Sequence, residues 1–219
     1  MLDIEILSIT SLNDSCTSWS FLSEFEIVRA NKFLKVQDSL LFKLGRLMVR
    51  KRLSKELGLS LQDVPISFNN FGKPVCEIEN SLNFSISHSG SFVVVGWSDF
   101  PIGVDIEPLS SLVDSNLDNL IFNSHEINSF IDHEVNANLH RLRLFVSKEA
   151  VLKCLGFGFS VDPKLVQLNE YEKPWKIISA SYLDHKLFVK IDILPSGYLL
   201  GVASHSMDTL FCQTSAVFQ

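Results

Sequence analysis

Two carboxylates separated by one residue are the first feature of this sequence that could do chemistry. Residues 103–108 read Gly-Val-Asp-Ile-Glu-Pro, which predicts a strand that ends at Pro108. Residues two apart on a strand share a face, so Asp105 and Glu107 point the same way and Ile106 points into the core. The two charges repel, and a divalent cation with oxygen ligands, such as Mg²⁺, would remove that cost. The alternative is a strand end with two solvated acids.

A second candidate group comes from a helical pattern. Residues 145–153 read Phe-Val-Ser-Lys-Glu-Ala-Val-Leu-Lys, and Glu149 and Lys153 lie four residues apart on one helix face. The pattern is either an ordinary helical ion pair or a third metal carboxylate beside a lysine that meets a phosphate and can deliver a proton.

A third group lies at the end of another strand-like run. Residues 83–90 read Asn-Phe-Ser-Ile-Ser-His-Ser-Gly, and such a tip offers backbone N–H groups, hydroxyls and an imidazole to an anion. A nucleophilic Ser87–His88 pair is the rival interpretation, but no G-x-S-x-G elbow accompanies it. Lys73, in Gly-Lys-Pro, adds a cation on a turn that is otherwise an ordinary loop.

The elements that must position these groups occur in the same order in both halves of the chain. A leucine-rich helix over residues 40–57 ends at Leu-Gly, and a second helix over about 140–155 also ends at Leu-Gly. Each helix is followed by a turn with Lys-Pro and then by two strands. The predicted strands and turns are 66–68, 83–87 and 92–97 in the first half, and 169–174, 187–193 and 198–203 in the second. Either the short shared motifs are a coincidence, or the chain forms two related lobes with a seam between them.

We therefore predict an α+β protein of two similar lobes, each a helix packed on a small antiparallel sheet. The N-terminal lobe would span 1–104 and the C-terminal lobe 105–219, with an insertion at 110–140 that is rich in Asn, Ser and Asp and is expected to be partly mobile.

Composition excludes several classes of protein. The 219 residues are 46% hydrophobic and 20% charged, which is globular and neither disordered nor fibrous. The longest apolar run, 92–97, is far shorter than the ~20 residues of a membrane span, and the N-terminus lacks the pattern of a signal peptide. The net charge of −6 argues against bulk nucleic-acid binding.

Two further compositional features bear on environment and partners. The four cysteines are far apart, which argues against a structural zinc or a disulfide scaffold and predicts reduced thiols in a cytoplasmic protein; they are Cys16, Cys76, Cys154 and Cys212. A basic run over residues 43–55 is either a solvated helix face or a local anion-facing surface. Its members are Lys43, Arg46, Arg50, Lys51, Arg52 and Lys55.

Taken together and in this order, the motifs at 72–74, 83–89, 103–107 and 148–153 resemble the signature set of the 4′-phosphopantetheinyl transferases, especially the two-lobed Sfp-type members. The resemblance covers roughly residues 25–205. It implies a pseudo-twofold monomer that binds coenzyme A at the lobe interface. It also implies transfer of the phosphopantetheine arm to a serine of an acyl or peptidyl carrier protein, with release of adenosine 3′,5′-bisphosphate.

The resemblance also implies residue roles. Asp105, Glu107 and Glu149 would hold Mg²⁺ against the pyrophosphate, and Lys153 would contact that pyrophosphate and could protonate the leaving group. The residues expected to contact the adenine nucleotide are Lys73, Ser87 and His88, with His88 and Arg29 at the 3′-phosphate. Glu126, in Phe-Asn-Ser-His-Glu, matches a family glutamate proposed as the base for the carrier serine; a metal-bound water and Glu149 are the alternatives.

The chain departs from the family pattern at two positions. Phe145 stands where a tryptophan is usual, and the apolar Ile106 leaves a metal position to water. Two rival functions stay open: a metal-dependent phosphodiesterase or nuclease, and a non-catalytic relative that binds coenzyme A.

The carrier and its pathway are open as well. Fatty-acid, polyketide, peptide and siderophore pathways all fit, although two-lobed members more often serve secondary metabolite biosynthesis. An acidic carrier could be steered by the basic run at 43–55 or by Arg141, Arg143 and Lys148.

Overall fold

The leucine-rich segment of the first half forms a long helix that carries the N-terminal lobe. In the computed structural model, which describes residues 2–11, 18–132, 137–169, 177–211 and 213–218, this helix is α2 (Val36–Leu57). It begins four residues before the predicted range, and it ends at Gly58, whose φ of +69° gives the expected left-handed C-cap. Leu41, Leu44 and Leu53 are buried on its inner side, which packs on a sheet.

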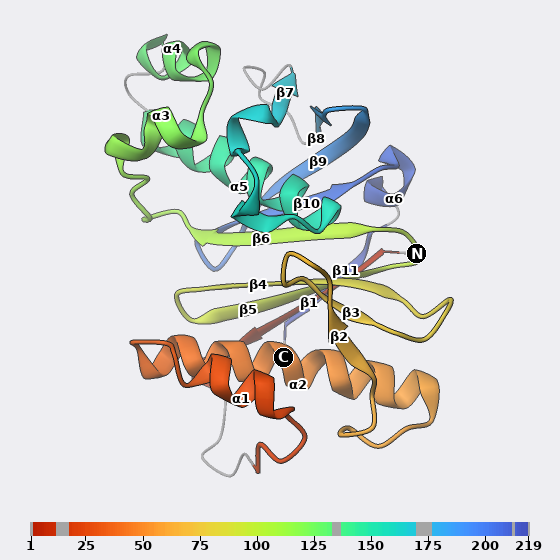
Figure 1. Cartoon of the computed structure of the whole chain (residues 1–219). Coiled ribbons are helices and arrows are strands. Elements are labelled where there is room, and N and C mark those ends of the chain that lie inside the picture. The colour runs from red at the N-terminus through yellow and green to blue at the C-terminus, as the bar shows by residue number, and fades with distance from the viewer. Residues whose placement is uncertain (1, 12–17, 133–136, 170–176, 212, 219) are drawn as a thin grey trace.

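The sheet under α2 has four strands in the order β11-β1-β5-β4. Its strands are β1 (Leu2–Ser8), β4 (Asn83–Ser89), β5 (Phe92–Ser98) and β11 (Gln213–Phe218). The short strands β2 (Ile66–Phe68) and β3 (Pro74–Cys76) form a separate hairpin. A short helix, α1 (Glu24–Ala30), lies beside α2 (Figure 1).

The C-terminal lobe repeats this arrangement with α5 (Ala137–Leu155) on a five-stranded sheet in the order β6-β10-β9-β8-β7. Its strands are β6 (Ile102–Pro108), β7 (Gln167–Asn169), β8 (Ile177–Tyr182), β9 (His185–Leu194) and β10 (Tyr198–Ser204). The other helices among the described residues are η1 (Ile9–Ser11), η2 (Ser115–Leu117), α3 (Asp118–Ile121), α4 (Ser124–Asp132), η4 (Gly158–Ser160), η5 (Pro163–Leu165) and α6 (Met207–Phe211).

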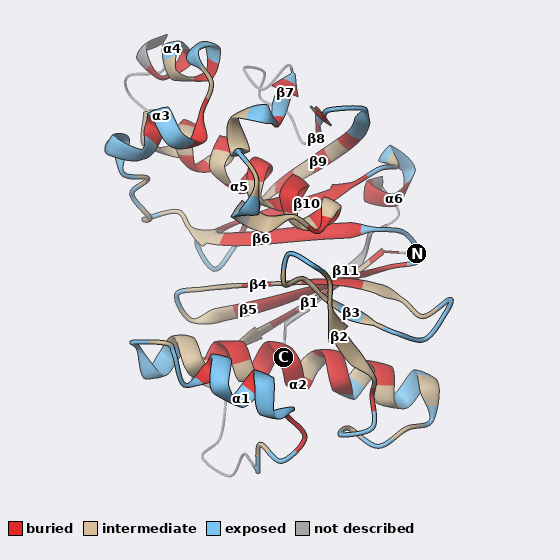
Figure 2. Cartoon of the chain, viewed as in Figure 1, coloured by how far each residue is buried: buried red, intermediate tan, exposed pale blue. Residues whose placement is uncertain are grey.

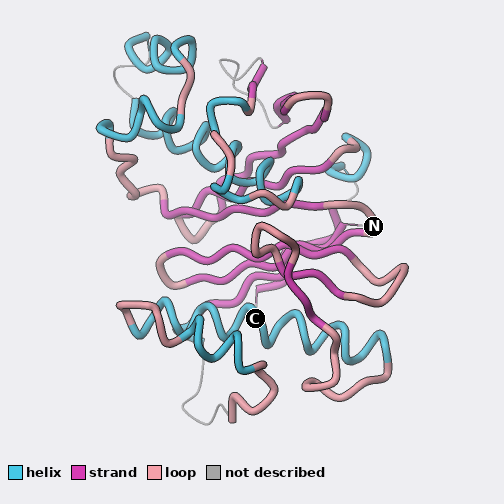
Figure 3. The backbone as a smooth tube through the Cα atoms, in the orientation of Figure 1, coloured by secondary structure: helices cyan, strands magenta, loops and turns pink. Residues whose placement is uncertain are grey.

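The two lobes stack as four layers, with a helix outside, two sheets inside and a helix outside (Figure 1, Figure 3). An apolar cluster that includes Ile4, Val104 and Leu200 joins the two sheets. β6 is buried along most of its length (Figure 2). It pairs with β10 on one side, and on the other its backbone N–H groups at Val104 and Ile106 donate to the hydroxyls of Ser85 and Ser87 on β4. The lobes therefore meet through an apolar cluster and through hydrogen bonds between β6 and β4.

The predicted α+β pair of similar lobes is confirmed, with a helix on an antiparallel sheet in each. The structure differs at the C-terminus, where β11 crosses back and pairs in parallel with β1 of the N-terminal lobe. This pairing joins segments remote in the sequence, such as Leu2 and Gln213, so no local sequence pattern could predict it. β6 also begins at Ile102, just before the boundary placed after residue 104.

Parts of two predictions lie beyond what the structure describes. The turn expected at 169–174 falls mostly within residues 170–176, which lie outside the described residues. The insertion at 110–140 contains η2, α3 and α4, and its residues 133–136 also lie outside the described part. No helix in the described ranges is both long and apolar enough to cross a membrane.

The basic run of α2 does not form the continuous surface that the sequence allowed. Arg46 and Arg50 are buried beside Glu26 of α1, with Arg50 Nη2 2.9 Å from Glu26 Oε2. Arg52 is drawn into ion pairs with carboxylates of β1 and α2, namely Asp3, Glu5 and Glu56. Burial of one side of an amphipathic helix explains the difference, because Arg46 and Arg50 share the face that packs on α1.

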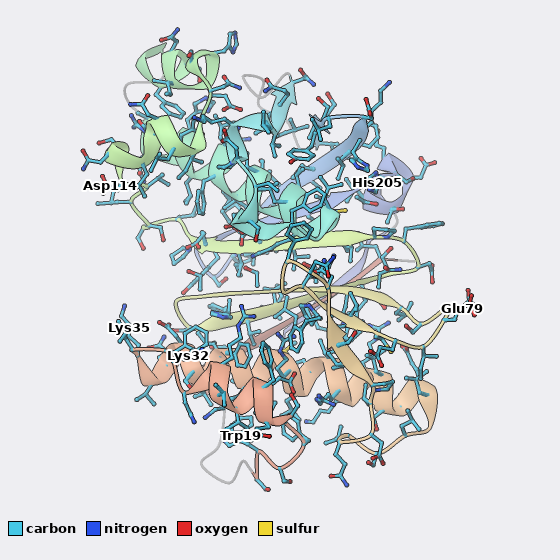
Figure 4. The ribbon with its side chains drawn as sticks, viewed as in Figure 1. Trp19, Lys32, Lys35, Glu79, Asp114 and His205 are labelled. Atoms are coloured by element: carbon cyan, nitrogen blue, oxygen red, sulfur yellow. The ribbon has the colours of Figure 1, made fainter. Side chains whose placement is uncertain are left out.

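Two lysines that precede that run are exposed, as are Lys51 and Lys55 within it. Lys32 and Lys35 lie at the edge of the N-terminal lobe, where α1 leads into α2 (Figure 4). Lys148, named as a steering residue, is fully buried, so a role in long-range attraction of a partner is wrong for it.

Candidate active site

The ammonium group of Lys153 lies where three elements meet. From α5 it is 2.7 Å from Asp105 Oδ1 of β6 and 3.4 Å from Glu149 Oε2, one helical turn away. It is also 3.0 Å from Ser87 Oγ of β4. The helix and strand spacings therefore bring two of the predicted acids to a single cation at the seam.

The carboxylate of Asp105 contacts protein groups through one oxygen, while its other oxygen has no hydrogen-bond partner in the described part of the chain. Its side chain is buried, and Oδ1 accepts a hydrogen bond of 2.8 Å from Ser87 Oγ. Oδ2 is buried and has no hydrogen-bond partner among the described residues. Ile106 points into the apolar cluster between the sheets, as expected. A buried oxygen without a partner is costly unless a ligand completes it.

Glu107 follows on the same strand, but its carboxylate turns toward hydroxyl groups. Oε2 accepts hydrogen bonds from Ser89 Oγ at 2.7 Å and from Ser111 Oγ at 3.4 Å. Burial raises the pKa of Glu107, and the charge of Asp105 raises it further, against the opposing effect of the Ser89 hydrogen bond. Glu107 therefore lies within electrostatic reach of Asp105 without touching Lys153.

The negative charges of Asp105, Glu107 and Glu149 repel one another, and this repulsion favours the protonated forms of Glu107 and Glu149. Burial raises the pKa of Glu149 to about 7, and Asp105 and Glu107 add to this shift while Lys153 opposes it. Burial acts to lower the pKa of Lys153, but the combined charges of Asp105 and Glu149 outweigh it, so the pKa is raised. Lys153 therefore stays protonated at neutral pH, and the cluster still holds more negative than positive charge.

These residues fit the chemistry of a magnesium ion. Carboxylate oxygens are the ligands that Mg²⁺ prefers, and Asp105 Oδ2 lacks a partner. In the part of the chain that the structure describes, however, no three His, Cys, Asp or Glu side chains are arranged as a metal site. Glu107 is engaged with Ser89 and Ser111. The three-carboxylate magnesium site stays a prediction.

A cavity of about 390 Å³ opens beside Lys153 between the lobes. Its basic lining residues are Arg29, Arg46, Lys73, His88 and Lys153, and its aromatic walls come from Phe42, Phe71 and Phe157. Basic groups beside aromatic faces suit a ligand that carries both phosphates and a planar base. The cavity therefore gathers all four basic residues that sequence reasoning had placed at a nucleotide or its pyrophosphate.

Arg46 is the basic lining residue that sequence reasoning had named only as part of the basic run at 43–55 and not as a nucleotide contact. It is buried, its Nε lies 3.4 Å from Glu26 Oε1, and its Nη1 has no hydrogen-bond partner among the described residues. Burial lowers its pKa to about 10, against the favourable charge of Glu26. Arg46 lies four residues after Phe42, so the two share one face of α2. This spacing is the feature of the sequence that could have placed Arg46 at the cavity beside Phe42.

His88 and Arg29 occupy the rim where an anion was expected. Burial lowers the pKa of His88, and the charge of Lys153 lowers it further. The ring of His88 packs edge-on against Phe33 at 6.1 Å, and the guanidinium of Arg29 lies 5.9 Å from the ring centre of Phe42. The structure places both residues at one cavity; their contact with a phosphate is not tested.

Lys73 and Ser87 reach the seam but already have protein partners. Lys73 Nζ donates to the backbone carbonyl oxygens of Ile102, Lys153 and Cys154. Ser87 Oγ lies between Asp105 and Lys153. Their predicted contacts with the nucleotide stay predictions.

Glu126 is not brought to the cavity. It is 1% exposed in the C-terminal lobe, and its Oε2 lies 2.9 Å from Lys148 Nζ. It also accepts from the backbone N–H of Asn123, whose side chain accepts from the N–H of Glu126, a reciprocal pair at the start of α4. These contacts give Glu126 a structural explanation, and its role as a base is untested.

Comparisons with known proteins give the same assignment for both halves. A family model described as "4′-phosphopantetheinyl transferase, N-terminal" matches residues 11–98, and one described as "4′-phosphopantetheinyl transferase superfamily" matches residues 101–203. The chain is similar to the 4′-phosphopantetheinyl transferase ffp of Bacillus subtilis, 27% identical over 194 residues that cover 86% of this chain and 84% of the relative.

Two further relatives agree. The 4′-phosphopantetheinyl transferase Sfp of Bacillus subtilis strain 168 is 27% identical over 86% of this chain and 84% of its own length. The 4′-phosphopantetheinyl transferase gsp of Aneurinibacillus migulanus is 28% identical over 59% of this chain and 54% of its own length. With both lobes matched and the expected acids and lysine gathered at their seam, the chain belongs to the 4′-phosphopantetheinyl transferase superfamily and is of the Sfp type.

Proposed function

We propose that this protein transfers the 4′-phosphopantetheine arm of coenzyme A to a serine of an acyl or peptidyl carrier protein in a Mg²⁺-dependent reaction. The observation that carries the proposal is the position of Lys153 between Asp105 and Glu149, at the end of a cavity lined by Arg29 and His88. Phosphoryl transfer needs mainly charge neutralisation and placement, and this arrangement supplies groups for both.

The cavity residues would act on the part of coenzyme A that does not react. Arg29 and His88 would hold the 3′-phosphate, and Phe42, Phe71 and Phe157 would flank the nucleotide. Binding energy from this remote end would fix the pyrophosphate next to Lys153.

The reacting groups would come from α5. The serine oxygen forms a bond to the phosphorus on the pantetheine side, and the bond from that phosphorus to the bridging oxygen breaks. Glu149, which lies beside Lys153 on the same helix face, would accept the serine proton. Lys153, which stays protonated, would hold the leaving phosphate oxygen as charge develops.

Asp105, Glu107 and Glu149 are the residues that would hold Mg²⁺. The ion would supply positive charge to the pyrophosphate. Ser87 would keep Asp105 oriented through its 2.8 Å hydrogen bond. A monomeric state, a cytoplasmic location and a carrier of secondary metabolism are proposals from sequence alone.

The direct test is to incubate the protein with coenzyme A, Mg²⁺ and an apo-carrier protein and to weigh the carrier by intact-mass spectrometry. The carrier should gain the mass of one phosphopantetheine arm, and a carrier with alanine at the modified serine should not. Chelation of Mg²⁺ and the Asp105→Asn variant should each abolish the gain. If no member of a broad set of carriers gains the arm, the proposal is wrong.

The assignment of the 3′-phosphate has its own test. Arg29→Ala should raise the KM for coenzyme A while leaving the KM for 3′-dephospho-coenzyme A almost unchanged. Lys55→Met, an exposed residue of α2, is the matched control. Equal losses with both substrates would remove Arg29 from the 3′-phosphate.

A further inference from the structure

The β2–β3 hairpin of the N-terminal lobe reaches across the seam and contacts the end of α5. Lys73, at the base of β3, extends its ammonium to the carbonyl oxygens of Lys153 at 2.7 Å, Ile102 at 3.0 Å and Cys154 at 3.4 Å. Two of these acceptors belong to the last turn of α5. The side chain that resemblance assigns to a nucleotide is thus engaged with the catalytic helix.

The end of a helix is where such a cation is most effective. The last carbonyl groups of a helix lack intrahelical partners and carry partial negative charge. In α5, Gly156 has a φ of +81° and its N–H donates to Lys153 O at 3.2 Å, while the N–H of Phe157 donates to Leu152 O at 2.9 Å. These two bonds form a Schellman-type cap. Lys73 adds a charged donor to Lys153 O and reaches Cys154 O.

Two neighbours of Lys73 contact the same segment. Asn69 Nδ2 donates to Gly156 O at 2.8 Å, and Phe71 packs edge-on against Phe157 with ring centres 5.1 Å apart. Asn69 also holds the turn, because its Oδ1 accepts from the N–H groups of Phe71 and Lys73. Three side chains of the segment 69–73 therefore contact residues 153–157 of the C-terminal lobe.

We propose that Lys73 is a positioning residue that caps α5 from the opposite lobe and so fixes Lys153, rather than a ligand of the nucleotide. One residue carries both ends of the link: the carbonyl of Lys153 binds Lys73, and its ammonium binds Asp105. The β2–β3 hairpin of the N-terminal lobe thereby sets the position of Lys153, which pairs with Asp105 in the C-terminal lobe. The kinetic part of this inference rests on the transferase function proposed above.

Kinetics and binding separate the two roles. Lys73→Met keeps the aliphatic stem and removes the donors. If Lys73 is a cap, kcat should fall about 10- to 100-fold, because small displacements of a reacting group are costly. The Kd for adenosine 3′,5′-bisphosphate, measured by calorimetry, should change little. If Lys73 is a nucleotide ligand, this Kd should rise by about tenfold or more, and that result would overturn the proposal.

A series of Lys73 variants, together with hydrogen exchange, distinguishes loss of the cap from general misfolding. Lys73→Arg, which keeps the charged donors, should retain more of kcat than Lys73→Gln, which in turn should retain more than Lys73→Met. Hydrogen exchange of amides 152–157 should speed up in Lys73→Met while the first turns of α5 keep wild-type protection. Lys55→Met is the matched control and should change none of these quantities.

The exchange and binding measurements need no transfer activity. They therefore still test the cap if the wild-type protein fails to modify any carrier. Unchanged exchange at 152–157 in Lys73→Met would contradict the cap, whatever the kinetics show.

Discussion

At the scale of single residues, the burial of charged groups predicts a stability that depends on pH. Burial, with a further contribution from the charges of Asp105 and Glu107, raises the pKa of Glu149 to about 7, from 4.5 for the ordinary side chain. A carboxyl group whose pKa is higher in the folded than in the unfolded chain binds protons more tightly when folded. Its contribution to stability is complete below about pH 4.5 and is lost as pH rises through 7.

Glu149→Gln should therefore gain stability relative to the wild type as pH rises. The gain between pH 4.5 and 8 should approach about 3 kcal/mol, because each unit of pKa shift is worth about 1.4 kcal/mol. Urea unfolding of both proteins at several pH values, with a metal chelator present, measures it. A difference in unfolding free energy that is constant with pH would contradict the raised pKa.

Glu126 provides a second prediction at this scale. Glu126→Gln leaves the buried ammonium of Lys148 without its counter-charge, so it should lower the free energy of unfolding by about 3 kcal/mol. Transfer by the remaining folded protein should stay near wild type. Urea unfolding and kcat per folded molecule measure the two effects.

The paired variant Glu126→Leu with Lys148→Met is the control, because it removes both charges and should recover part of the stability. If instead kcat collapses in Glu126→Gln while stability is retained, Glu126 is the base for the carrier serine.

At the scale of elements, close approach of a helix to a strand decides where the reacting groups meet. Gly103 of β6 lies directly against the backbone of α5, where an added Cβ would collide with Ala150 O and Cys154 N. Gly45 of α2 faces side chains instead: an added Cβ would lie 2.8 Å from Ile86 Cγ2. The first collision is closer and is with backbone atoms, whereas the second is with one side-chain methyl group, which needs a smaller shift.

Gly103→Ala should therefore cost at least about 3 kcal/mol of unfolding free energy, and Gly45→Ala should cost about 1 kcal/mol or less. Gly103→Ala should also lower transfer in the folded protein, since it pushes the strand of Asp105 away from the helix of Lys153. Thermal unfolding and kcat measured on both variants compare them. Equal effects of the two changes would contradict this explanation.

At the scale of the whole molecule, the two lobes share an apolar core between their sheets. Leu200 of β10 is 1% exposed in this core, which also contains Ile4 of β1. The strand β11 ties the chain's last described segment to the N-terminal sheet. Neither lobe buries its inner sheet face without the other, so we expect them to unfold together.

Leu200→Ala should destabilise both lobes by the same amount, about 2–5 kcal/mol. Hydrogen exchange at increasing urea should report one common free energy of opening for core amides of α2 and α5, and the variant should lower both. Protection lost in α5 but retained in α2 would show that the lobes unfold independently.

The sequence by itself determined the elements and the local spacing of the reacting groups. The helix of α5, the strand of β6 and the left-handed glycine after α2 follow from periodicity and from backbone geometry, which act over a few residues. The same short range places Glu149 and Lys153 on one face.

Only the tertiary structure decided what these groups touch. The capping contacts of Lys73, the burial of Arg46, the pairing of Glu126 with Lys148 and the return of β11 all join segments remote in sequence. A lysine or glutamate has the same local pattern whether it faces solvent, a ligand or a helix end. Its partner is chosen by the packing of the lobes, because burial makes an unpaired charge or carbonyl group costly and so favours arrangements in which most such groups find a partner.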